Sequence, residues 1–335
     1  MKTKLVAIAK DEAAYLPEWI FHHLYFGFDE IEILVNFTTD CSFEVLEKIQ
    51  SNCPVKFRNA DDLIIPENNQ HDHLISPAYL KMNLLQSRAY AEILSNAPKD
   101  GFSHVMFLDI DELWMPLDFN NTIDSALIAL GDPDIAYFER KNKVSDTQEF
   151  CRPFQQEIRA ETHRLPKCIV KTDIEIELTS SHGARYLGQG RPKICGPRVT
   201  SEAFVLHRFQ RSQSEYLALL GRGDPKFLGK FGLKFNRNGY ISADTGKRIN
   251  FDQEFITKYD NLYDDFIISN ELAACVAKSR NFVKSRQIAM VDYMQTHATT
   301  NRLVKKLTKG VDAYFHPEFP DALPEKKAVE KPRKT

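Results

Sequence analysis

The sequence predicts an α/β protein with a Rossmann-like, mostly parallel mixed sheet flanked by helices and a helical C-terminal extension. Three observations predict this class. Short apolar runs alternate with segments of helical periodicity up to about residue 97, as in chains that pass from a central strand to a covering helix and back. Another apolar run ends in the carboxylates of MFLDIDELW, residues 106–114. Finally, 335 residues with 43% hydrophobic content suffice for a large core.

The N-terminal elements follow from this alternation. The run KLVAIAK stops at a charged residue on each side, as central parallel strands do. The next segment carries apolar residues at helical spacing, with Pro17 near its start and Gly27 at its end. The same pair of signals then repeats. Strands are expected over residues 4–10, 31–37, 55–60 and 104–108, and helices over 11–27, 42–50 and 74–97.

Beyond about residue 134 the pattern is looser. Strand-like runs at 135–140, 167–172 and 203–209 are separated by polar loops, and helical patterns follow at 212–223, 254–266 and 270–285. We therefore expect a main domain over residues 1–225, a mainly helical extension over 226–310 and a flexible charged tail over 311–335, because the tail cannot bury enough apolar surface to fold alone.

Composition excludes several classes of function. Lys and Arg total 44 against 46 Asp and Glu, so no overall field attracts nucleic acid. The N-terminal apolar run is too short for a signal-peptide core, and no run reaches the ~18 residues that a membrane span needs. The six cysteines form no Cys-x-x-Cys pair. We therefore expect a cytoplasmic protein with reduced thiols.

The acids of MFLDIDELW predict a metal site. Ligands of open α/β sheets bind beyond the carboxyl ends of the strands, and alternation along a strand places Asp109 and Asp111 on one side. Two such carboxylates suit Mn²⁺ or Mg²⁺, which complete their coordination with water and phosphate oxygens. The alternative is that Asp-x-Asp marks only a turn or a helix cap. Glu112 is expected to start a helix or to support the other acids from behind.

The expected cargo is a nucleoside diphosphate. The first turn, AKDEAAY, contains no glycine, whereas a dinucleotide-binding turn needs Gly-x-Gly-x-x-Gly for close approach of the backbone. The chain also lacks the Gly-x-x-x-x-Gly-Lys-Ser/Thr of P-loop enzymes. Rossmann dehydrogenases and P-loop enzymes are therefore disfavoured, and a nucleotide diphosphate held by a metal is favoured.

Four motifs then resemble those of one family. The start AKDEAAYLPEWIFHH, the turn VNFTTDCS, the segment HVMFLDIDELW and the stretch FVLHRFQRSQSEYLALLGRG occur in the order found in GT-A-fold glycosyltransferases, specifically the family-2-like bacterial enzymes related to the family-92 group. The resemblance covers roughly residues 4 to 224. The sequence departs from the family pattern at Asp11, usually Asn, at Thr38 and Thr39, usually a Ser-x pair, and at Arg208, usually Tyr.

The resemblance implies a metal-dependent transferase that moves a sugar, of hexose type, from a nucleotide-diphosphate donor, UDP-linked, to a glycan or lipid-linked glycan acceptor in surface polysaccharide synthesis. Residues 1–225 would be the donor-binding and catalytic domain, with acceptor-side elements over 135–225. Basic residues of the tail could touch an anionic membrane at its inner face. The resemblance assigns nucleotide contacts to Lys10, Glu12, Asn36, Asp40, Asp109 and Arg222, and Mn²⁺ or Mg²⁺ ligands to Asp109, Asp111 and His207.

Several assignments keep an alternative. Asp11 and Asp40 could instead cap the helices that follow them. Cations at Arg208, Arg211 and Lys230 could hold phosphate or lie solvated on the surface.

Inversion at the anomeric carbon is expected and requires a general base, but several acids remain open for that role and a retaining mechanism is not excluded. The candidate catalytic residues are Glu175, Glu177 and His182, with Glu139 and Glu161 as further acids.

Two other classes remain as alternatives. A nucleotidyltransferase or another metal-dependent enzyme acting on nucleotide diphosphates would also place paired acids at the end of a strand. A nucleotide-sugar-binding protein without catalysis would keep the same fold. The first alternative favours a first turn rich in Gly and basic residues, which AKDEAAY is not.

Overall fold

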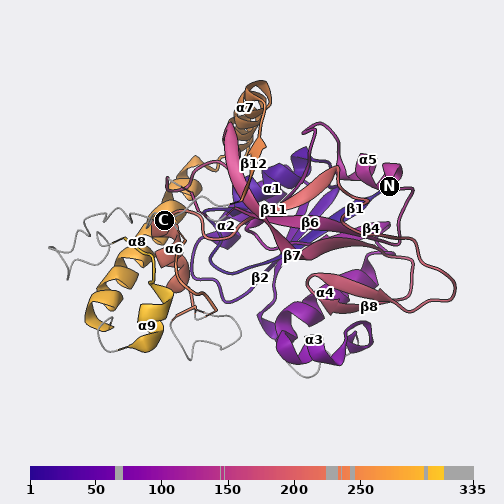
Figure 1. Cartoon of the computed structure of the whole chain (residues 1–335), viewed down its shortest axis with the longest axis horizontal. Helices are drawn as coiled ribbons and strands as arrows, with labels where there is room; N and C mark the ends of the chain where they lie inside the picture. The colour runs from indigo at the N-terminus through magenta and orange to yellow at the C-terminus, as the bar shows by residue number, and fades with distance from the viewer. Residues whose placement is uncertain are drawn as a thin grey trace, which may run out of the picture.

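The computed structural model describes residues 1–64, 71–143, 145–146, 148–223, 233–234, 236–241, 246–297 and 301–312. Within them, one ten-stranded sheet runs in the order β3-β2-β1-β4-β7-β6-β11-β5, with β10 beside β6 and β12 beside β7 (Figure 1). The strands are β1 Thr3–Ala9, β2 Glu30–Val35, β3 Val55–Asn59, β4 His104–Phe107, β5 Glu112–Pro116, β6 Ile135–Lys143, β7 Glu157–Lys171, β10 Ile194–Cys195, β11 Ala203–Arg208 and β12 Lys247–Asn250; β8 Ile176–Ser180 and β9 Gly183–Tyr186 form a separate hairpin.

The sheet is mixed and mostly parallel. Strands β3, β2, β1 and β4 are parallel to one another, and β6 is parallel to β11. Strand β7 runs antiparallel to both β4 and β6, and β5 runs antiparallel to β11. The fold class expected from the sequence is confirmed, with a helical C-terminal part. The helices are α1 Leu16–Tyr25, α2 Ser42–Gln50, α3 Pro77–Met82, α4 Leu84–Asn96, α5 Ile123–Ala129, α6 Gln213–Leu220, α7 Gln253–Ser269, α8 Ala273–His297 and α9 Arg302–Leu307, with 3-10 turns η1 Asp61–Ile64 and η2 Asp72–Leu74.

Helices cover both faces of the sheet (Figure 1). On one face, α1, α2 and α7 pack on a core that contains Trp19, Trp114 and Tyr259. On the other face, α3, α4 and the β8–β9 hairpin enclose a second core with Tyr90 and Phe107, whose rings stack 4.1 Å apart. A third cluster joins α6, α8 and α9 beside the sheet. No helix within the described ranges is both long and apolar enough to span a bilayer.

Three local features differ from the sequence-based expectation. The helix expected over 74–97 breaks at Asn83, whose φ of −147° and ψ of 63° are not helical. The chain after the acids forms strand β5, so Glu112 begins a strand and not a helix. The extension beyond residue 225 contributes β12 to the main sheet, and its Phe251 and Ile256 belong to the same core as α1. The extension is therefore an integral part of the main hydrophobic core.

Two adjacent histidines of α1 are buried in neutral form. The His23 Nδ1–H donates to the Trp19 carbonyl at 2.8 Å, and its Nε2 accepts the Trp114 N–H at 3.2 Å. His22 donates from Nε2 to the Trp114 carbonyl at 2.8 Å and accepts the Tyr259 hydroxyl at Nδ1, 3.0 Å away. Burial lowers the pKa of His22 to about 3 and that of His23 well below its usual range. Each ring must therefore stay neutral to keep both of its hydrogen bonds.

This pair predicts acid lability. The ordinary pKa of histidine is about 6.5. Below that pH His22 and His23 are protonated in the unfolded chain but stay neutral in the folded protein. The free energy of unfolding is expected to fall as the pH drops from 6.5 toward 5, by up to about 1.4 kcal/mol per pH unit for each histidine. Urea titrations of the wild type and of His22→Gln check this, with His71→Gln as the control. A wild-type stability that is unchanged between pH 7.5 and 5 would contradict it.

Candidate functional site

Three loops meet at one edge of the sheet. They follow β2, β1 and β4, which lie side by side in that order and parallel, so residues 36–40, 10–12 and 108–111 leave the same edge. Strand β11 brings a fourth segment to this edge, because its antiparallel pairing with β5 sets His207 opposite Glu112. The sequence-predicted acids and His207 thus converge although they lie almost a hundred residues apart.

Asp111 and His207 form the centre of this edge. The Nε2 of His207 lies 3.4 Å from Oδ2 of Asp111, and its Nδ1–H donates to Oδ1 of Asn142 at 3.0 Å. With Nδ1 bonded to Asn142, Nε2 is the ring atom that faces the carboxylate, and this pair offers one nitrogen and one oxygen to a cation. Burial would raise the pKa of Asp111, but His207, with Arg211 and Arg237 nearby, holds that pKa well below its usual range. Asp111 is therefore ionised.

Asp109 is fixed by a buried lysine. The Nζ of Lys167, whose side chain is 1% exposed, lies 3.2 Å from Oδ2 of Asp109 and 2.7 Å from Oε2 of the fully buried Glu112. The Trp19 indole N–H donates to the carbonyls of Asp109 and Glu112, at 3.0 and 2.8 Å. Burial raises the pKa of Glu112. The Asp109 side chain remains 46% exposed and faces the open edge, while the Trp19 indole fixes its backbone carbonyl.

These residues fit a metal that takes few protein ligands. No group of three or more His, Cys, Asp or Glu side chains in the described part of the chain is arranged to hold a metal ion. The pair formed by Asp111 and His207 offers one oxygen and one nitrogen, and Asp109 lies two residues from Asp111. A carboxylate with an imidazole suits Mn²⁺, which fills its other positions with water or phosphate oxygens.

The residues expected to contact the nucleotide differ in how far they are engaged. Glu12 forms an ion pair with Arg222 through Oε1, and its Oε2 lies 3.6 Å from Arg211. Arg222 also donates to the Lys10 carbonyl at 3.2 Å. Asn36 is 1% exposed, and neither atom of its side-chain amide has a hydrogen-bond partner within the described structure. Buried amides are nearly always hydrogen-bonded, so Asn36 is available to a ligand.

Asp11 and Asp40 instead fasten the loops to each other. Asp40 accepts the N–H groups of Ala13 at 2.8 Å and Ser42 at 2.9 Å. Asp11, with a φ of 50° that Asp tolerates, accepts the Thr39 N–H at 2.7 Å and pairs with Arg286 of α8 at 2.8 Å. Asp11 does not cap the helix that follows it, because the N-cap of α1 is Tyr15 and no side chain bonds there. Asp40 accepts the first N–H of α2, although the N-cap position there is Cys41. The carboxylate oxygens of both acids are taken by protein donors.

Of the candidate catalytic residues, His182 is the one that lies beside the acids. It occupies the turn between β8 and β9, and its Nδ1–H donates at 3.1 Å to the carbonyl of Pro166, the neighbour of Lys167. Burial, followed by the charges of Lys167 and Arg140, lowers the pKa of His182 to about 3, so the ring is neutral and a weak base.

The two acids of the hairpin lie differently. Glu177 is paired with Arg185 at 2.6 Å. Glu175 is exposed and precedes β8, roughly 16 Å along the strand from the turn.

The structure also changes or extends several assignments. Arg208 is not free to hold phosphate, because its guanidinium bonds Glu18 at 3.0 Å and Asp146 at 2.9 Å.

Lys230 and nearly all of the basic tail lie outside the described residues. Lys167 and Arg237 were missed; the one signal in the sequence is that Lys167 interrupts an otherwise apolar strand run. Charged residues in such runs are buried only when paired.

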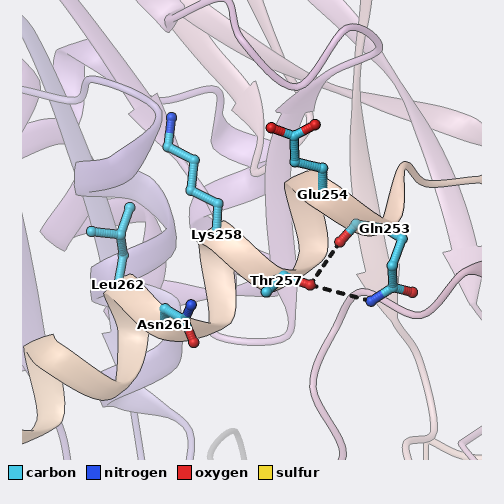
Figure 2. A pocket seen from close by; sticks show the side chains of 6 residues that line it. All are labelled: Gln253, Glu254, Thr257, Lys258, Asn261 and Leu262. Carbon is cyan, nitrogen blue, oxygen red and sulfur yellow. Dashed lines mark hydrogen bonds between the residues drawn. The ribbon is translucent and has the colours of Figure 1, made fainter.

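A separate depression of about 490 Å³ lies on the outer side of α7 (Figure 2). One helix supplies its lining, and Thr257 within it donates its hydroxyl to the Gln253 carbonyl at 2.9 Å. The opposite side of α7 packs in the core through Ile256 and Tyr259. This depression shares no residue with the edge of the sheet that carries Asp109, Asp111 and His207, which we refer to as the acid edge. Its lining residues are Gln253, Glu254, Thr257, Lys258, Asn261 and Leu262.

Comparison with known proteins gives distant structural similarities. No protein-family profile and no curated protein matches the sequence. The chain is similar to S. aureus TarS 1–349, at 14% identity over 90% of this chain and 93% of that chain, with a TM-score of 0.36. The structure of the same protein in complex with UDP matches at 12% identity, with the same coverage and TM-score. It is also similar to the galactosyltransferase LgtC in complex with donor and acceptor sugar analogues, at 17% identity over 40% of this chain and 46% of that chain, with a TM-score of 0.23. HddC from Yersinia pseudotuberculosis matches at 10% identity over 62% of this chain and 93% of that chain, with a TM-score of 0.33.

Proposed function

We propose that this protein is a glycosyltransferase that moves a sugar of hexose type from a nucleotide-diphosphate donor, UDP-linked, to a glycan or lipid-linked glycan acceptor of surface polysaccharide synthesis. The observation that carries the proposal is the acid edge itself. Asp109, Asp111 and His207 lie together there with a group of cations. The same edge carries Asn36, whose amide has no hydrogen-bond partner in the described structure. Such a site suits a ligand with a neutral polar end and an anionic centre.

Asn36 and Glu12 would bind the nucleoside. A buried amide without partners costs about 1–3 kcal/mol, and a pyrimidine base or a ribose offers both the acceptor and the donor that the amide of Asn36 lacks. Glu12 also has an oxygen, Oε2, that is buried without a hydrogen-bond partner in the described structure. Both residues follow neighbouring strands, so one nucleoside could reach both.

Mn²⁺ or Mg²⁺ would be held by Asp111 and His207, and Asp109, which the described structure does not group with them as a third ligand, would reach the ion through a water molecule. Bound there, the ion would neutralise negative charge that develops on the departing nucleoside diphosphate. The chain's own contribution is to keep Asp111 ionised and to orient His207 through Asn142. Lys167 keeps Asp109 ionised, since the nearby ammonium outweighs burial and lowers the pKa of that carboxyl.

The transfer would invert the anomeric carbon. The bond between the anomeric carbon and the diphosphate oxygen breaks as the acceptor oxygen bonds the opposite face, and a base takes the acceptor proton. Glu139, Glu161, Glu175 and Glu177 are the candidate bases. His182, with its low pKa, would serve instead as a hydrogen-bond acceptor for a sugar hydroxyl, because its Nδ1–H is already committed to Pro166.

Calorimetric titration with UDP tests the proposal. The wild type with Mn²⁺ is expected to bind UDP, and Asn36→Ala to bind it about tenfold more weakly, as loss of one or two buried hydrogen bonds implies. Asn261→Ala, on the exposed side of α7 (Figure 2), is the matched control and should bind as the wild type does. Absence of UDP binding by the wild type would refute the proposal. Release of inorganic pyrophosphate from a nucleoside triphosphate would instead support a nucleotidyltransferase.

A further inference from the structure

Four cations stand beside Asp111, and we refer to them as the cation cluster: Arg211, Arg222, Lys234 and Arg237. Arg211 follows β11, and Arg222 follows α6. Lys234 and Arg237 come from the segment after residue 232, in the part of the chain that the sequence resemblance does not reach. Both are within electrostatic range of Asp111 and of Arg222.

The fold holds this later segment against the exit of β11. The amide of Gln210, which is 2% exposed, donates to the Gly239 carbonyl at 2.7 Å and accepts the Ile241 N–H at 2.8 Å. The Lys234 N–H donates to the Leu220 carbonyl at 2.8 Å. The Arg237 guanidinium lies 4.7 Å from the ring of Phe209, and that ring lies 5.5 Å from the ring of His207. Lys234 and Arg237 are therefore built into the acid edge.

Two members of the cluster have no ion-pair partner among the described residues. Glu12 pairs with Arg222 and lies 3.6 Å from Arg211, whereas Lys234 and Arg237 have no ion pair within the described residues. Asp111 acts on all four cations. Asp109 also acts on Arg237, and Glu215 on Arg211, but no carboxylate forms an ion pair with Lys234 or Arg237 within the described residues. Burial, followed by the charges of Arg222 and Arg237, lowers the pKa of Lys234 to about 7.

Uncompensated cations in a partly buried site are costly, and a bound anion removes that cost. The two side chains without an ion pair, Lys234 and Arg237, suit the diphosphate of a nucleotide sugar, which carries two negative charges. Arginine also presents paired N–H donors that suit phosphate oxygens.

We propose that Lys234 and Arg237, together with Arg211 and Arg222, bind the diphosphate of the donor directly, so that donor binding does not depend on a divalent cation. The inference rests on the proposed function and adds to it the residues that hold the diphosphate. The metal would then act on the leaving group during transfer, while affinity for the donor comes from the protein.

Titration of the full chain in EDTA tests this with three probes: UDP, UMP and uridine. The wild type is expected to bind UDP at least about tenfold more tightly than UMP, since a second phosphate gains charge-assisted hydrogen bonds. Lys234→Gln and Arg237→Gln should each weaken UDP binding about tenfold and leave uridine binding unchanged. Lys258→Gln on the exposed side of α7 (Figure 2) is the control, with no change for any probe.

Two outcomes overturn the inference. The first is a wild type that, without metal, binds UDP no more tightly than uridine while Mn²⁺ restores the preference; in that case the proposed function survives and this inference fails. The second is a pair of variants that lose uridine affinity as much as UDP affinity, which indicates a structural role. If none of the three probes binds even with Mn²⁺, the proposed function itself fails.

Discussion

Asp111→Asn is expected to lower kcat/KM for sugar transfer at least about 100-fold. Removal of one preorganised group that stabilises developing charge typically costs this much or more. Here the substitution removes the carboxylate that lies 3.4 Å from Nε2 of His207 and that interacts electrostatically with all four members of the cation cluster. The rate is measured as release of UDP from UDP-sugars in the presence of Mn²⁺, first with water and then with a glycan acceptor.

Two controls separate chemistry from folding. Asp265→Asn changes an exposed carboxylate of α7 and should leave kcat/KM unchanged. Uridine affinity in Asp111→Asn should stay within about twofold of the wild type, because the nucleoside contacts lie on other loops. A tenfold or smaller loss of kcat/KM with intact uridine binding would show that Asp111 does not carry the reaction.

Lys167→Met is expected to lower the free energy of unfolding by about 3–5 kcal/mol, the usual cost of leaving a buried charge without its partner. Glu112 is fully buried, and the one cation that its carboxylate would keep among the described residues is the more distant Arg140, whose Nη1 lies 3.4 Å away. Urea titration at pH 7.5 measures the loss. Lys171→Met on the same strand is the control, since its ion pair with Asp132 is partly exposed and worth at most about 1 kcal/mol.

A double variant tests whether this loss comes from the buried pair. Combining Lys167→Met with Glu112→Gln removes the stranded charge and keeps an oxygen that can accept the Asp109 N–H, which Glu112 now accepts at 3.0 Å. We expect the double variant to recover more than half of the lost stability. Additive losses from the two single substitutions would mean that Lys167 and Glu112 are not energetically coupled.

The part of this architecture that depends on local periodicity could be predicted. Strands β1, β2, β3 and β4 follow apolar runs, and their parallel order places residues after each run at one edge, so the position of Asp109 and Asp111 followed from the sequence. Strand β5 was missed, because Glu112 is a charge at its first position and the run is only five residues long. The break at Asn83 was missed because apolar spacing continues on both sides of it.

The electrostatics of the site could not be predicted in the same way. Lys167 lies 58 residues from Asp109, and the pairing of β4 with β7 is what brings it there. The roles of Asp11 and Asp40 in joining the loops also depend on the tertiary fold. Asp40, for example, accepts a hydrogen bond from Ala13, which lies 27 residues earlier in the chain. A sequence reveals which side chains can bond backbone N–H groups, but not whether a ligand or a neighbouring loop takes the bond.

The ion pair between Asp11 and Arg286 joins positions 275 residues apart. During synthesis β1 and the loop that follows it emerge well before α8, so this loop lacks its partner until residue 286 has been made. Domains generally fold as units rather than strand by strand. The loop after β1 is therefore fixed in place only when α8 joins the fold, so the segment that completes this side of the site is made long after the loop itself.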